Sequence, residues 1–453
     1  MFSRKAVLFA LAGLLASIGL ARADNAPKTS LSLDPTVITA DAGGDAADRA
    51  PLMMALDKVG AAKPLDDLKL NIYGWIESGY SYNHRHIEHE TPIVPGPFNH
   101  EVGNHYMLNQ FDLRFERLVD TKKFDVGGLV EAVYGTDPGF MHSSGLGFNG
   151  NDPTDDGVPA DAIPDKYRAF YQFDLAQAYV DINLPVGNGL TFRVGKFVTL
   201  LGNETVDPRQ NAFYSHSWIF NALPFSQTGI LGMYQLTEQW KIIAGITRGW
   251  DMTLEDNNGA IDGLGSIAYT PSDQLSFTLN WNVGPQNNGD NSHYRTVVDP
   301  IVGWQVTKEF KLTAEALYIY DGGYNTEDAA PGVTHAYGDA WALCVYGSYT
   351  LNDYLTLNGR VEKFHSYMDP FSALGPTSDT SLFNVAGDFA STVNIYSFTL
   401  GVTVTPMPKD ALLKNLSIRP EIRYDFSEDP VFTQHGSNFK DQMTFAADII
   451  LKF

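Results

Sequence analysis

The chain has 453 residues, a formal net charge of −22 at pH 7, and a hydrophobic content of 44%. This acidic balance argues against nucleic acid as a partner, because phosphate backbones are bound by clusters of Lys and Arg. The single cysteine, Cys344, excludes an intrachain disulfide. The fold therefore needs another source of stability, and a closed β-sheet without unpaired edges would supply it.

The first 23 residues have the pattern of a secretory signal peptide. Arg4 and Lys5 form the charged start, residues 6–20 are the apolar stretch, and Ala21-Arg22-Ala23 is a small-x-small cleavage site. The alternative is an N-terminal membrane anchor, but the apolar stretch is shorter than the roughly 20 residues of a helical span. We therefore expect export, cleavage before Asp24, and a mature chain without a helical anchor.

Residues 24–66 are predicted to form a periplasmic segment ahead of the main fold. They are rich in Ala, Asp and Gly, and 51–60 fits a short amphipathic helix with Pro at its first turn and Gly at its end. Two roles stay open for this segment, a tether that precedes the fold or a plug inside it.

Sixteen segments after residue 67 alternate between apolar and polar residues with a two-residue period, which is the pattern of half-buried β-strands. The clearest example is 175–197, where two alternating runs flank a Pro-Val-Gly-Asn-Gly turn and predict a β-hairpin. The predicted strands span 68–82, 105–119, 124–136, 171–184, 190–198, 227–236, 239–250, 260–270, 274–284, 294–306, 309–320, 339–350, 354–365, 392–404, 415–427 and 440–453.

The connections between these strands alternate in length. Those after even-numbered strands are short, as at 120–123 and 307–308, whereas those after odd-numbered strands are longer. Short turns on one side and long loops on the other are typical of bacterial outer-membrane barrels, in which the short side is periplasmic. Because every backbone N–H in a bilayer needs a partner, a spanning sheet closes on itself and turns its polar face inward.

A soluble β-sandwich would show similar alternation. The export signal, the loop lengths, and the 7 Trp, 22 Tyr and 27 Phe residues, many near predicted strand ends, favour a barrel with aromatic girdles. We predict an all-β fold, a transmembrane antiparallel β-barrel of about 16 strands over residues 67–453. Its last strand turns Phe445, Ile449 and Phe453 to one face, which resembles the terminal strand that the barrel-insertion machinery reads.

Several sequence blocks resemble the putative β-barrel porin-2 (OmpL-like) family. They are NIYGWIESGY at 71–80, LNQFDLRFE at 108–116, EAVYGTDPG at 131–139, LAQAYVDINLP and GNGLTFRVGKF within 175–197, NAFYSHSWIF at 211–220, PFSQTGI at 224–230, GWD at 249–251, and RPEIRYDFS at 419–427. The resemblance extends over residues 68–453 and implies an outer-membrane porin, without implying a particular solute.

The third long connection, 199–226, is rich in aromatic residues and carries several charged side chains. In sixteen-stranded porins the third long loop folds into the lumen and sets the bore, and by position this segment is the third. Its length and aromatic content favour a packed loop, and the alternative is an ordinary exterior loop.

We predict a pore constriction between this loop and the opposite wall. Glu204 and Asp207 on the loop would face Arg360, Arg419 and Arg423, because strands five and thirteen lie eight apart in a ring of sixteen. The resulting transverse field would tune ion selectivity where the pore is narrowest. The alternative is that wall charges neutralise one another across neighbouring strands. The other predicted constriction residues are Arg114, Glu116, Arg193 and Arg209.

The sequence lacks G-x-S-x-G, P-loop, H-E-x-x-H and C-x-x-C motifs, so we predict no catalytic residues, no cofactor and no metal site. The His- and Glu-rich stretch 84–90 has zinc and copper ligands, but a solvated loop without preset geometry is the preferred interpretation. The Asp-rich stretch 152–165 lacks EF-hand spacing. His365 beside Ser366 is the single hint of a hydrolase on the barrel wall, without a third group.

The predicted function is passive diffusion of small hydrophilic solutes or ions through a bacterial outer membrane. A substrate-specific channel with its binding site in 199–226 is the second hypothesis, and an outer-membrane hydrolase is a more distant one. The expected partners are the solutes, outer-membrane lipid and lipopolysaccharide, the barrel-insertion machinery, and further copies of the chain in a homotrimer.

Overall fold

The computed structural model describes residues 49–84, 106–146, 171–287, 289–324, 336–367, 392–434 and 437–453. All of them lie in the larger of the chain's two compact units, Ser32–Phe453. Among these residues, no helix has the length and apolar character that crossing a membrane requires.

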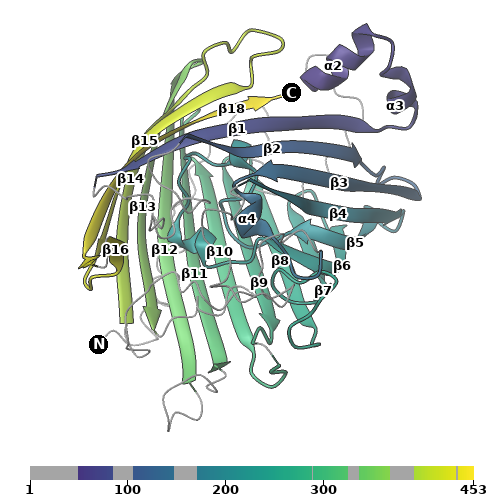
Figure 1. The fold of residues 1–453 in the computed structure, drawn as a ribbon. Helices are drawn as coiled ribbons and strands as arrows, with labels where there is room; N and C mark the ends of the chain where they lie inside the picture. The colour runs from purple at the N-terminus through teal and green to yellow at the C-terminus, as the bar shows by residue number, and fades with distance from the viewer. Residues whose placement is uncertain are drawn as a thin grey trace. The chain divides into compact units, whose positions relative to one another are not determined.

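Sixteen antiparallel strands form one closed barrel (Figure 1). Each strand pairs with its neighbours along the chain, and the ring closes where the first strand pairs with the last. This architecture confirms the predicted fold class. The strands are β1 (Asn71–Asn83), β2 (Tyr106–Arg117), β3 (Asp125–Gly135), β4 (Gln172–Leu184), β5 (Leu190–Val198), β6 (Ser226–Gln235), β7 (Trp240–Thr247), β8 (Asp262–Ser272), β9 (Leu275–Gly284), β10 (Arg295–Gln305), β11 (Phe310–Tyr324), β12 (Ala336–Asn352), β13 (Leu355–Tyr367), β14 (Thr392–Val404), β15 (Leu416–Ser427) and β18 (Asp441–Lys452).

The barrel closes at Gly74 on β1 and Phe453 beside β18. The Gly74 N–H donates to the Phe453 carbonyl at 3.1 Å, and the Phe453 N–H donates to the Gly74 carbonyl at 2.9 Å. A Cβ on Gly74 would lie 2.0 Å from the Asp112 carbonyl oxygen, so only glycine fits this close approach. The seam is therefore a paired ladder rather than an exposed edge.

The two faces of the strands differ as a membrane barrel requires. On β13 and β14 the outward Val361, Phe398 and Leu400 expose 51%, 51% and 66% of their surface, whereas the inward Arg360 and Glu362 are buried. Apolar side chains turned outward and charged ones turned inward would be unfavourable in water. The same arrangement is favourable when hydrocarbon surrounds the barrel.

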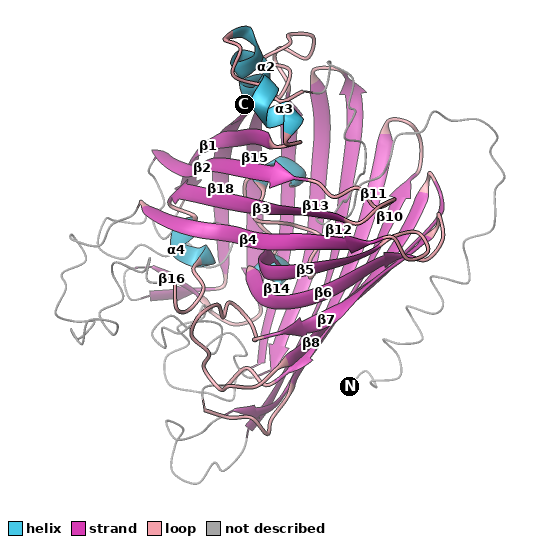
Figure 2. Cartoon of the chain, turned by 90° about the vertical axis from the view of Figure 1, so that its right-hand side faces the viewer, coloured by secondary structure: helices cyan, strands magenta, loops and turns pink. Residues whose placement is uncertain are grey.

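Several short elements accompany the barrel strands (Figure 2). α2 (Pro51–Lys58) occupies the position of the predicted helix, lies against β1, and buries Met53. α3 (Lys63–Asp67) follows it, and Arg49 pairs with Asp66 at 2.9 Å. The others are α4 (Pro138–Met141), η3 (Pro208–Gln210), α5 (Trp218–Asn221), and a two-stranded hairpin of β16 (Phe432–Gln434) and β17 (Ser437–Phe439).

The largest differences from the predicted strand limits are in β11 and β12. The alternation predicts 309–320 and 339–350, but pairing continues to Tyr324 opposite Ala336 after a register shift. The added residues include Gly322 and Gly338, which carry no side chain and so interrupt the alternation. The main-chain hydrogen bonds of the ladder continue where the alternation stops, because they do not depend on side-chain polarity.

Candidate functional site

The segment between β5 and β6, residues 199–225 and termed loop 3, contacts inward-facing residues around much of the barrel. Its own polar side chains fix its shape. Asp207 accepts the Arg209 N–H at 3.1 Å and caps η3, and Ser217 accepts the Phe220 N–H at 3.1 Å and caps α5. Asn211 bridges both main-chain groups of Thr205, at 3.0 and 2.7 Å. Loop 3 is therefore an ordered, folded segment.

Carboxylates of the wall accept hydrogen bonds from the loop 3 main chain. Glu421 on β15 accepts the N–H groups of Tyr214 and Ser215, at 2.9 and 3.2 Å. Glu362 on β13 accepts those of Trp218 and Ile219, both at 2.9 Å. These charge-assisted bonds pair N–H groups that an irregular buried segment would otherwise leave unsatisfied.

Two further carboxylates hold the start of loop 3 from the β10 and β11 wall. Asp299 accepts the Gly202 N–H and Glu315 accepts the Asn203 N–H, each at 2.8 Å. On the other side, Gln110 of β2 donates to the Val206 carbonyl at 2.9 Å. β2 and β10 lie eight strands apart in the ring of sixteen. Residues 202–206 therefore cross from one wall of the barrel to the opposite wall.

Arginines of the wall bind the carbonyl groups of the same loop. Arg360 donates to the Ser215 carbonyl at 2.7 Å, and Arg423 donates to the His216 carbonyl at 2.5 Å. Arg419 donates to two carbonyls, Pro208 at 2.8 Å and Asn211 at 2.6 Å. Wall acids thus bind loop N–H groups and wall bases bind loop C=O groups.

The predicted acidic and basic residues are in direct contact in the structure. Glu204 pairs with Arg360 at 2.5 Å, and both side chains are buried. Asp207 pairs with Arg209 at 2.5 Å and lies 3.6 Å from Arg114. Burial opposes ionisation of Glu204 and Asp207, but the neighbouring cations hold the pKa of each carboxyl below its ordinary value. These three contacts neutralise the charges locally.

The remaining predicted residues pair along the wall. Arg419 binds Asp448 of β18, and Arg423 binds Asp425 of its own strand. Arg114 also binds Glu131 of β3 at 3.0 Å. Two predicted residues form separate wall pairs without a recorded bond to loop 3. These are Arg193, which binds Asp181 at 2.9 Å, and Glu116, which accepts the Tyr73 hydroxyl at 2.8 Å.

Aromatic side chains that were not predicted as site residues complete the site. The Trp75 ring lies 4.5 Å from the Arg114 guanidinium and 4.0 Å from that of Arg209, within cation–π distance of both. The Tyr214 hydroxyl donates to Asn109 at 3.1 Å. A Cβ on Gly79 would lie 2.3 Å from the Tyr214 ring. Trp75 occupies an inward-facing position of β1, and this position is the one sequence feature that would have identified it.

An apolar cluster also fixes loop 3 and was not predicted. Trp218 and Ile219 of α5 pack with inward residues of β11 to β14, including Ile319 and Phe364, and with Phe432 of the β16–β17 hairpin. The Trp218 and Phe432 rings are 6.5 Å apart. The inward face in this sector is therefore partly apolar, although the sequence predicted a polar inward face.

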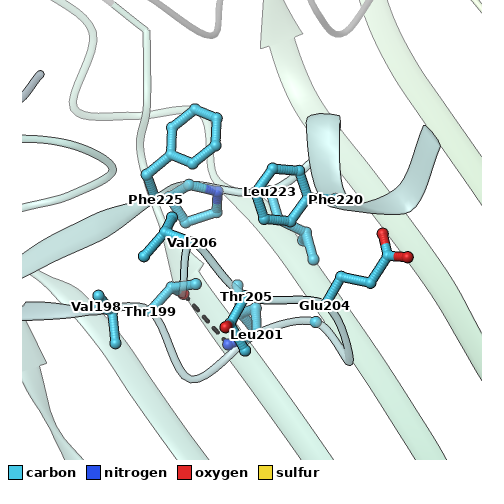
Figure 3. Close-up of a pocket in the computed structure, with 11 residues that line it drawn as sticks. Val198, Thr199, Leu201, Glu204, Thr205, Val206, Phe220, Leu223 and Phe225 are labelled. Atoms are coloured by element: carbon cyan, nitrogen blue, oxygen red, sulfur yellow. Dashed lines mark hydrogen bonds between the residues drawn. The ribbon is translucent and has the colours of Figure 1, made fainter. Parts of the chain in front are cut away.

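A pocket lies between the two limbs of loop 3 (Figure 3). The two limbs are residues 199–206 and 220–225, and the Leu201 N–H in the first limb donates to the Thr199 hydroxyl at 3.2 Å. The pocket is lined by Val198, Thr199, Leu201, Gly202, Glu204, Thr205, Val206, Phe220, Leu223, Pro224 and Phe225. Because the pocket has a volume of only about 20 Å³, enough for about one water molecule, we interpret it as a packing gap of the folded loop rather than a solute site.

A closed sixteen-stranded barrel with apolar residues outside and charged residues inside is the architecture of outer-membrane porins. The family model for Putative beta-barrel porin-2, OmpL-like, matches residues 69–453, so the chain belongs to this family of outer-membrane porins. No curated protein sequence matches the chain.

The chain is similar to solved structures of low sequence identity. The outer membrane channel DcaP of Acinetobacter baumannii has a TM-score of 0.50 and 14% identity, over 85% of this chain and 97% of that chain. The outer membrane protein OmpT of Vibrio cholerae, in its trimer form, has a TM-score of 0.49 and 11% identity, over 85% and 99%.

Proposed function

We propose that the protein is a passive diffusion porin for small hydrophilic solutes or ions, in which loop 3 sets the bore. The observation that carries this proposal is the attachment of loop 3 to opposite walls, at Asp299 of β10 and Gln110 of β2. A segment held by a carboxylate on one side and by a side-chain amide on the other does not swing out with a passing solute. The bore would therefore be fixed by the fold rather than by solute binding.

Deletion of residues 203–216 tests this role. The shortened protein should insert as a folded barrel and show a larger single-channel conductance in a planar bilayer, because the crossing segment is gone. Deletion of residues 408–413, in the largely exposed connection between β14 and β15, is the control and should leave conductance closer to that of the full chain. Equal conductance for the 203–216 deletion and the full chain would place the bore elsewhere.

A substrate-specific channel is the second candidate, and the group around Trp75 favours it. Two guanidinium groups, of Arg114 and Arg209, flank this ring beside Asp207. The Trp75 ring is buried, whereas 20% of the Arg209 side chain is exposed, so Arg209 is the group of this site that an anionic solute can reach. Block of the single-channel current by one anionic solute at low concentration, and loss of that block in Arg209→Gln, would favour this candidate over passive diffusion.

We also propose export with cleavage before Asp24, no catalytic step, and assembly as a homotrimer. N-terminal sequencing of protein from the outer membrane tests the cleavage position. Light scattering in detergent, corrected for bound detergent, tests the trimer. Absence of lipid hydrolysis by the purified, inserted barrel tests the lack of catalysis.

A further inference from the structure

A group of polar and aromatic side chains lies on the outer face of the barrel, at the end opposite the short turns. It consists of Trp341 on β12, Lys363 and His365 on β13, and Asn394 and Tyr396 on β14, and is termed the outer-rim cluster. Lys363 follows the outward Val361 by two residues, and Tyr396 precedes the outward Phe398 by two, so both share the outward parity. The cluster therefore faces lipid, near the extracellular boundary of the membrane.

Two aromatic rings hold the Lys363 ammonium in place. Its Nζ lies 5.2 Å from the centre of the Trp341 ring and 4.9 Å from that of Tyr396, both within cation–π distance. His365 stacks on Trp341 with ring centres 5.3 Å apart, and its Nδ1 lies 2.9 Å from the Asn394 side-chain oxygen. The ammonium is thus positioned by rigid groups.

This ammonium has no anionic partner in the part of the chain that the structure describes. No carboxylate there lies within 4.0 Å of Lys363, and its ammonium contacts the two rings. Glu428 adjoins the cluster but accepts hydrogen bonds from the Tyr396 hydroxyl at 3.3 Å and from Asn394 at 3.4 Å. A cation on a lipid-facing surface is costly unless water or an anion reaches it. Its three N–H donors are therefore available to an anionic group from outside the chain.

We propose that the outer-rim cluster binds the phosphate of an outer-leaflet lipid, with lipid A of lipopolysaccharide as the occupant. The Lys363 ammonium donates to the phosphate, and the Trp341 and Tyr396 rings lie beside the headgroup at the boundary of oily and wet layers. This site is on the outside of the barrel and depends on the outer-membrane location rather than on the pore. Failure of the pore experiments would therefore leave it intact.

The test is native mass spectrometry of the purified full-length barrel titrated with bis-phosphorylated lipid A. The same lipid after removal of its phosphates is the chemical control. Lys363→Gln should weaken binding of the phosphorylated lipid by about fivefold, the effect expected of one Lys near a membrane surface. Lys363→Arg keeps the charge and the ring contacts and should retain most of the binding.

Lys308→Gln is the matched variant, since it removes the same charge from an exposed turn at the opposite end of the barrel. It should bind lipid A like the unmodified chain. The proposal fails if Lys363→Gln binds like the unmodified chain, if Lys308→Gln weakens binding equally, or if the dephosphorylated lipid binds as tightly. Displacement of lipid A by inorganic phosphate would assign the site to a free anion and would also overturn it.

Discussion

Arg360 joins the barrel wall to loop 3 by donating to three acceptor atoms of the loop. Its guanidinium donates to the Glu204 carboxylate at 2.5 Å, to the Ser215 carbonyl at 2.7 Å, and to the Ser215 hydroxyl at 2.9 Å. The Phe213 ring lies 5.0 Å from the guanidinium carbon. Removal of one partner of such a buried pair leaves the other charge uncompensated, which costs more than the pair itself contributes.

We expect Arg360→Gln to release loop 3 by leaving the Glu204 charge buried and unpaired, at a cost of about 3–5 kcal/mol. Single-channel recordings should show a larger and noisier current. The double variant Glu204→Gln with Arg360→Gln should return toward the original current, because no charge is then left unpaired.

Arg193→Gln is the control for the Arg360 prediction. It breaks the buried pair with Asp181, which joins β4 to β5 without a recorded bond to loop 3. Thermal unfolding should show lower stability for this variant, while its conductance stays close to that of the unmodified chain. A quiet, unchanged current in correctly inserted Arg360→Gln would contradict a role of this pair in fixing the loop.

At the scale of elements, the strands were predictable from the sequence, but the attachments of loop 3 were not. β5 and β14 have the limits predicted from the sequence, 190–198 and 392–404, because a two-residue period and a turn or loop define both ends. The attachment of loop 3 has no period. Glu362 binds Trp218 across 144 positions of sequence, through a main-chain N–H that every residue except proline carries. The sequence therefore indicated that charged wall residues contact loop 3, but it did not indicate which loop atoms they bind.

The end of loop 3 is anchored by Asp251, in the connection after β7. Its carboxylate accepts the N–H groups of Phe225 and Ser226 at 3.0 and 2.8 Å, and its own φ of 52° is a left-handed conformation that Asp tolerates. Desolvation raises the pKa of Asp251 to about 7, although these hydrogen bonds act in the opposite direction. The anchored state therefore binds the Asp251 proton more tightly than the detached state does.

The anchor should weaken as the pH rises from about 4 to about 7, and stay constant above that range. When docking raises the pKa of a carboxyl, protonation of that carboxyl stabilises the docked state. This stabilisation is lost when the carboxyl ionises. Hydrogen exchange at Phe225 and Ser226, corrected for its intrinsic pH dependence, should accelerate over this interval.

Asp251→Asn keeps an acceptor oxygen and tolerates the same φ, so the pH dependence of exchange should disappear in this variant. Asp256→Asn is the control in the same connection, since its carboxylate caps Asn258 and Gly259 rather than loop 3. Corrected exchange rates that stay level between pH 4 and 7 in the unmodified chain would rule out this titration.

At the scale of the whole molecule, acidic and basic side chains of the inward wall differ in how deeply they are buried. The chain carries −22 overall, yet Glu315, Glu362 and Glu421 on the inward wall are buried and engaged by loop 3. The inward Lys311 and Lys452 are only half-buried and lie near the short-turn end of the barrel. Net charge read from the sequence therefore does not describe the surface that a permeating ion meets.

We expect this pore to prefer anions despite its acidic composition. In a KCl gradient across a planar bilayer, the reversal potential should have the sign of an anion-selective pore and should grow at low ionic strength, where screening is weaker. Lys311→Gln with Lys452→Gln should move it toward cations. The pair Lys308→Gln with Lys409→Gln, in exposed turns at the same end, should move it less. A cation-selective unmodified pore would show instead that charges outside the barrel wall dominate permeation.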